Sequence, residues 1–137
     1  MGDKKRCLLI GLAILITVLL IGSKVYMDKQ QEAKVRQEEM IEVVKSEEAK
    51  KVFEEGLKNL DSKALTSEGV IQNYKIDYES IEQNQMGGIM VDLIINHDSK
   101  LKVYNSLNKS QPSGRLKNSG GGNSFELEEL LELREGD

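Results

Sequence analysis

The sequence predicts an α+β fold with an N-terminal transmembrane helix, an amphipathic helix packed on an antiparallel meander of three to four strands, and a short C-terminal helix. Three observations carry this prediction. A stretch without charges runs from Cys7 to Gly22. Apolar residues recur at helical spacing over residues 40–60, and from Val70 onward they alternate with polar ones, which is typical of strands. The 137 residues leave room for one modest core outside the apolar segment.

The chain begins MGDKKRCLLIGLAILITVLLIGSKVYMDK, in which a basic cluster at positions 4–6 precedes the apolar stretch. A helix needs about 20 residues to span the hydrocarbon core of a bilayer, and residues 7–27 supply that length. We therefore predict a cytoplasmic basic region over residues 1–6 and a transmembrane signal-anchor over residues 7–27. The signal-anchor is the part that would contact the cell membrane. The basic cluster favours a cytoplasmic N-terminus and an extracytoplasmic remainder, in a single-pass topology.

A signal peptide that is removed is the alternative, because a basic start and an apolar core also fit such a peptide. Its cleavage site requires small residues, and Ile21 stands where one is expected in Ile21-Gly22-Ser23. Under this alternative the chain is a secreted soluble factor that begins near Lys24. Cys7 is the only cysteine, so the chain has no internal disulfide.

Residues 28–39 are rich in charge, and we interpret them as a helical stalk or a linker. Residues 40–137 make up the predicted extracytoplasmic domain. Its first element is an amphipathic helix over residues 40–60, whose apolar side chains fall on one broad arc. The members of this arc are Ile41, Val44, Ala49, Val52, Phe53, Leu57 and Leu60.

The strands follow, each marked by alternation and by β-branched or aromatic residues. We predict strands over residues 70–78, 89–96 and 101–107, a break in the first near Glu79-Ser80, and a short edge strand over residues 115–118. Short turns join them, at Met86-Gly87-Gly88, His97-Asp98-Ser99 and Gln111-Pro112-Ser113-Gly114. Short turns between successive strands predict an antiparallel meander.

The tail supplies a further helix. We predict that Ser119–Gly122 form a flexible hinge and that Asn123 caps the helix, with Glu126 three residues later. Leu127, Leu130 and Leu131 form an apolar stripe on this helix. The stripe either docks on the body of the domain or binds another protein.

The two faces of the predicted sheet differ in composition. One is apolar and suits the helix over residues 40–60, whereas the other mixes charges with Met90, Ile94 and Tyr104. We predict an interaction module whose partner is an envelope protein or peptide. The candidate interaction residues are Met90, Ile94, Tyr104, Leu127, Leu130 and Leu131.

The residues point to no chemistry, and we predict no catalytic residue, no cofactor, no metal and no enzyme. A single His and a single Cys cannot supply the three or four ligands of a zinc site. The net charge of −4 without a basic stripe disfavours nucleic acid as a partner. A carboxylate-dependent envelope hydrolase is the enzymatic alternative, since Asp77 and Asp92 can share the outer face; cross-strand pairing with Lys75 and Lys102 is the structural interpretation.

The stretch EEMIEVVKSEEAKKVFEEGLKNLDSKALTSEGVIQNYKIDYESIEQNQMGGIMVDLIIN, followed by SGGGNSFELEELLE, resembles a known family. It is the domain-of-unknown-function family numbered 1310, small proteins of streptococci and related Gram-positive bacteria. The resemblance covers nearly the whole chain, including its basic start and apolar segment. It implies a place in a Gram-positive envelope, it implies no established activity, and it carries no functional residue over to this chain.

Overall fold

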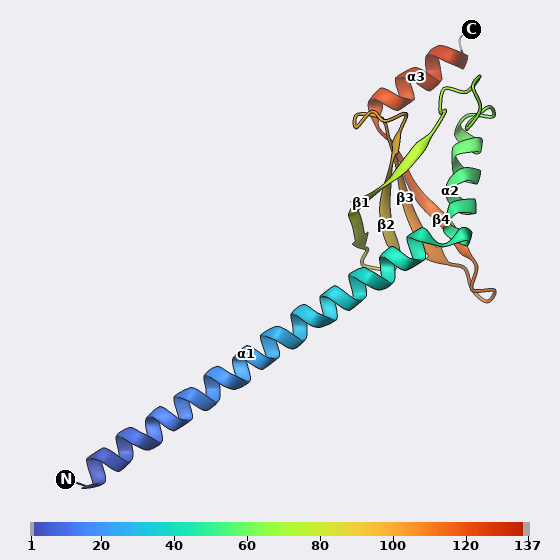
Figure 1. Ribbon diagram of the computed structural model, residues 1–137. Coiled ribbons are helices and arrows are strands. Elements are labelled where there is room, and N and C mark those ends of the chain that lie inside the picture. The colour runs from blue at the N-terminus through green and yellow to red at the C-terminus, as the bar shows by residue number, and fades with distance from the viewer. Residues whose placement is uncertain (1, 136–137) are drawn as a thin grey trace. The chain divides into compact units, whose positions relative to one another are not determined.

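The computed structural model describes residues 2–135 and divides into two compact units, the first ending at Arg36 and the second beginning at Gln37. Helix α1, Gly2–Lys45, contributes to both units. The other elements belong to the second unit and are labelled in Figure 1. They are α2 (Glu47–Leu60), β1 (Tyr74–Gln83), β2 (Ile89–Ile95), β3 (Lys102–Lys109), β4 (Leu116–Asn123) and α3 (Phe125–Glu135). The predicted α+β class is confirmed.

The first unit is a helical segment whose apolar side chains have no protein around them. The large apolar residues from Leu8 to Ile21 are 54–68% exposed. Within the helix, the Thr17 hydroxyl donates to the Ala13 carbonyl at 2.8 Å, which satisfies a polar group inside the apolar stretch. By length and composition α1 can cross a membrane, as either an anchor or a signal sequence would.

The predicted helix over residues 40–60 is divided at Ser46, where α1 ends and α2 begins. Ser46 has extended backbone (φ −66°, ψ 155°), its Oγ accepts from the Ala49 amide at 3.2 Å, and it donates to the Val43 carbonyl at 2.6 Å. This is N-cap geometry, and the two glutamates that follow suit the positive end of a helix. The break lets the end of α1 and the whole of α2 pack separately on one core.

The sheet is a four-stranded antiparallel meander in the order β1-β2-β3-β4. Alternate residues of the strands form the inner face of the sheet. This face makes up the core together with α2 and the end of α1. Figure 1 shows α2 running beside the sheet next to β4. The largest fully buried side chains are Phe53, Leu57, Ile71, Leu93, Ile95, Leu107, Leu127, Val44 and Val91.

The predicted break in the first strand is confirmed as a bulge. The register of β1 on β2 runs regularly from Tyr74 to Asp77 and shifts before Glu82. The predicted turn at His97-Asp98-Ser99 is also present, because Asn96 and His97 both have positive φ and the chain reverses there. A residue in that conformation serves a tight hairpin between β2 and β3.

Two predictions about the tail are wrong. Ser119–Gly122 are not a hinge but part of β4, which pairs with β3 through Tyr104↔Gly122 and Asn105↔Gly121. The capping residue is Ser124 rather than Asn123, since the Ser124 carbonyl accepts from the Glu128 amide at 3.1 Å. Ser124 also bonds β3, because its Oγ accepts from the Lys102 amide at 2.9 Å. Pairing with β3 therefore orders a glycine-rich segment that has little preference of its own.

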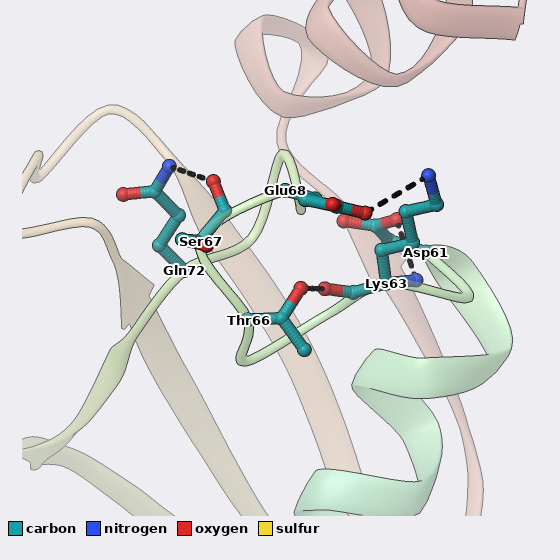
Figure 2. A network of polar contacts seen from close by, with 6 residues as sticks. All are labelled: Asp61, Lys63, Thr66, Ser67, Glu68 and Gln72. Carbon is teal, nitrogen blue, oxygen red and sulfur yellow. Dashed lines mark hydrogen bonds and ion pairs between the residues drawn. The ribbon is translucent and has the colours of Figure 1, made fainter.

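A buried carboxylate organises the loop between α2 and β1. Asp61 accepts from the Lys63 amide and from the Ile71 amide, each at 3.1 Å, and Figure 2 shows the surrounding polar contacts, including the Lys63–Glu68 ion pair at 3.2 Å. Burial raises the pKa of Asp61, but these two amides, a third from Val70 and the charge of Arg134 outweigh it, so the pKa lies below its ordinary value. Asp61 therefore holds the loop as a charged group.

Candidate interaction surface

The outer face of the sheet carries two adjacent rows of side chains that cross β1, β2 and β3. The strand register places Lys75 beside Ile94 and Ile94 beside Lys102, and we call these three the lysine row. Two residues along each strand, it places Asp77 beside Asp92 and Asp92 beside Tyr104, which we call the carboxylate row. We define the outer-face patch as both rows together with Met90: Lys75, Asp77, Met90, Asp92, Ile94, Lys102 and Tyr104.

The carboxylate row sets two like charges directly opposite each other. The prediction that Asp77 and Asp92 share the outer face is correct, but the register pairs them with each other and sets both lysines beside Ile94. Burial raises the pKa of Asp92, Lys102 lowers it, and Asp77 and Glu82 raise it further, with a net upward shift. Directly opposed like charges destabilise a sheet, and Lys102 offsets this repulsion only in part.

Ser80 fixes the two carboxylate-bearing strands together at the bulge. Its hydroxyl accepts from the Asp92 amide at 2.8 Å and donates to the Asp77 carbonyl at 2.6 Å. The Glu79 amide adds a hydrogen bond to Asp77 Oδ1 at 3.2 Å. The bulge thereby replaces the missing ladder bonds and holds Asp77 opposite Asp92.

The apolar part of the outer-face patch is open to solvent. Met90 is 38% and Tyr104 37% exposed, and Ile94 between them along β2 is half-buried. Neither α2 nor α3 covers them, because α2 packs on the inner face and α3 enters the core through Leu127. The three predicted residues of this face therefore share one surface.

The other three predicted interaction residues lie apart from this surface, on α3. Leu127 is fully buried in the core, Leu131 is half-buried against it, and Leu130 is 40% exposed. The helix thus docks through the first turn of its leucine stripe. Of the two roles considered for the stripe, docking on the body is the one that the structure contains.

Two hollows lie between α2 and strands β3 and β4, and Tyr104 also lines the smaller one. One of about 320 Å³ is lined by residues that include Val52, Glu55 and Leu116, and one of about 170 Å³ includes Leu60 and Gly121. Neither Asp77 nor Asp92 lines them. The opposed carboxylates lie on the outer face of the sheet.

The single His and the single Cys take no part in this surface. His97 is exposed in the turn between β2 and β3, and Cys7 is an exposed free cysteine of α1. Over residues 2–135 no three His, Cys, Asp or Glu side chains gather so that they could hold a metal ion.

A family model described as Protein of unknown function (DUF1310) matches residues 7–130. The chain belongs to the DUF1310 family. No curated protein and no solved structure matches it. Kinship is thus shown for nearly the whole of this DUF1310 chain, and what its surface does has to be argued from its own residues.

The sequence analysis did not predict two residues that support the outer-face patch in this DUF1310 chain. Asn118 braces an irregularity between β3 and β4, where its Oδ1 accepts from the Ser106 amide at 3.1 Å and its Nδ2 donates to Asn105 Oδ1 at 2.8 Å. Gly121 lies against the backbone of Tyr104, where a Cβ would overlap the Tyr104 carbonyl. The asparagines and glycines of this segment were the available signal, and they resemble those of a loop.

Proposed function

We propose that this protein is a membrane-anchored extracytoplasmic binding module that holds an envelope protein or peptide on its outer-face patch. One observation carries the proposal: a sheet face left open by its own helices combines exposed Met90 and Tyr104 with the half-buried Asp92. Exposed apolar and aromatic side chains rimmed by polar groups are typical of an interaction surface.

The anchor follows from α1. Its apolar residues from Leu8 to Ile21 have no partner within the described chain, and a bilayer would bury them. The basic cluster at positions 4–6 favours a cytoplasmic N-terminus, which puts the second unit outside the cell membrane. The poor cleavage site after the apolar stretch favours retention over removal.

Binding is preferred to catalysis because of the form of the site. A hydrolase that uses a pair of carboxylates needs both groups around a space that can admit a substrate, and such spaces are usually concave. The opposed carboxylates of the carboxylate row stand on a sheet face, and the hollows next to α2 are lined by other residues. We therefore propose a role without a reaction.

A photo-crosslinking amino acid tests the binding surface in intact cells that express the full chain. Placed at Met90 or Tyr104, it should give a discrete adduct with another polypeptide, and M90A/I94S/Y104A should remove an adduct formed from a nearby position such as Ser106. Met86, which is 93% exposed in a turn off the patch, is the matched control position. An adduct that survives in the triple variant, or equal labelling from Met86, would contradict the proposal.

Mass spectrometry of the mature N-terminus separates anchoring from secretion. Retention of the basic cluster on membrane-bound protein is the expected result. A mature chain that begins near Lys24 and appears in the medium would replace the anchored module with a diffusible one.

A further inference from the structure

The lysine row and the carboxylate row carry opposite charges and lie two residues apart along the strands, on the same face. Lys75 and Lys102 occupy β1 and β3 in the lysine row, whereas Asp77 and Asp92 occupy β1 and β2 in the carboxylate row. A face with a positive row beside a negative row is complementary to itself after a half-turn. This is the property that an interface between two identical subunits requires.

We propose that the partner on the outer-face patch is a second copy of this chain, related by a two-fold axis that runs parallel to the two rows and between them. This inference rests on the proposed function and names the partner of the same surface. The half-turn puts each lysine row over the carboxylate row of the other copy. It keeps β1 over β1 and β3 over β3, so that Lys75 meets Asp77 of the second copy and Lys102 meets its Tyr104.

The charges of the carboxylate row supply the reason for such a partner. Asp77 and Asp92 repel each other across the β1–β2 ladder, and the ion pair found among residues 2–135 is Lys63–Glu68, away from this face. The lysine row of a second copy would bring its Lys75 ammonium group to Asp77. The Lys102 ammonium group would lie over the exposed Tyr104 ring of the second copy, where a cation–π interaction would stabilise it.

The size of the face predicts how tight this pairing is. Four strands about 4.8 Å apart and about seven residues long span roughly 14 Å by 24 Å. Stable interfaces bury about 800 Å² on each partner, and this face offers less. The pairing is therefore weak in solution, and confinement of both copies to one membrane by α1 raises their effective concentration.

Reciprocal charge reversal at the Lys75–Asp77 contact tests the proposal in the full membrane-bound chain. K75E sets two acids against each other in a homodimer, and D77K sets two bases against each other, whereas a mixed pair restores both attractions. Two differently labelled copies are co-expressed, and energy transfer between them is measured in native membranes. K58E on α2 is the matched control, since Lys58 is exposed and lies away from the sheet.

We expect each single variant alone to weaken self-association by about tenfold, the mixed pair to recover it, and K58E to leave it unchanged. If neither K75E nor D77K changes self-association, the pairing would be assigned to the apolar helices and the inference would be overturned. The absence of energy transfer between wild-type chains would also overturn it.

The crosslinking experiment separates this inference from the proposed function. Adducts from Met90 with a different polypeptide, and without self-association, would retain the binding module and remove the second copy as its partner. The absence of any adduct from the patch, together with absent self-association, would overturn both.

Discussion

The two faces of the sheet are built from alternate residues of the same strands, and they differ in what completes them. On β2, Val91, Leu93 and Ile95 are fully buried among residues of α2 and α3. Their neighbours Met90, Asp92 and Ile94 face the other way, beside lysines, carboxylates and an exposed tyrosine. The inner face is completed within the chain, whereas the outer face keeps opposed charges and open apolar surface. Burial and exposure are thereby separated onto alternate positions of β2.

The largest test of this separation compares neighbouring residues of β2. Leu93→Ala should lower the free energy of unfolding by about 2–5 kcal/mol, because it leaves a cavity in a fully buried site. Ile94→Ala on the outer face should cost much less, about 1 kcal/mol or under, since part of its surface is already in water. Urea denaturation of the detergent-solubilised chain measures both. Equal losses would mean that the outer face is a second core.

The next test concerns the carboxylate that serves the core. Asp61→Asn should cost about 1–3 kcal/mol, because backbone amides lose a charged acceptor. The folded pKa of Asp61 is lowered, so its stabilisation is present above the unfolded pKa and is lost as the pH falls through the folded pKa. Urea midpoints between about pH 7 and pH 3 should therefore fall less steeply in the variant than in the wild type. Parallel curves would show that Asp61 is not the group responsible.

The smallest effect is expected at the carboxylate of the outer face, and it has the opposite sign. The pKa of Asp92 is raised by burial and by nearby acids, so its favourable contribution belongs to the protonated form and is lost as the pH rises through the folded pKa. Asp92→Asn removes the repulsion with Asp77, and at neutral pH it should leave stability unchanged or raise it by less than about 1 kcal/mol, given partial solvent screening. Thermal unfolding of the two chains measures this. A clear loss of stability would show that Asp92 supports the fold instead.

Sequence periodicity was sufficient to predict the two faces. Alternation along β2 separated buried from exposed positions, and the broken parity near Ser80 indicated the bulge. Periodicity could not predict that Asp77 lies opposite Asp92, because cross-strand pairing depends on the strand register as well as on the face that a residue occupies.

The remaining differences come from contacts between residues far apart in the chain. The glycines of β4 carry no side-chain pattern, and their order comes from pairing with β3 and from the close approach of Gly121 to Tyr104. Ser46 lies inside a stretch whose sequence pattern is continuously helical. Only the N-cap geometry of Ser46 divides this stretch into α1 and α2. The amides that bind Asp61 come from a loop whose course the sequence did not predict.

The irregular backbone of β1 and β4 has a consequence for aggregation. These are the two edge strands of the meander, and a flat edge is a template for intermolecular strand addition. The bulge between Asp77 and Glu82 interrupts one edge, and the positive φ angles of Gly120 and Gly122 distort the other. These interruptions protect the edges of the sheet from edge-to-edge polymerisation and leave its outer face as the regular exposed surface.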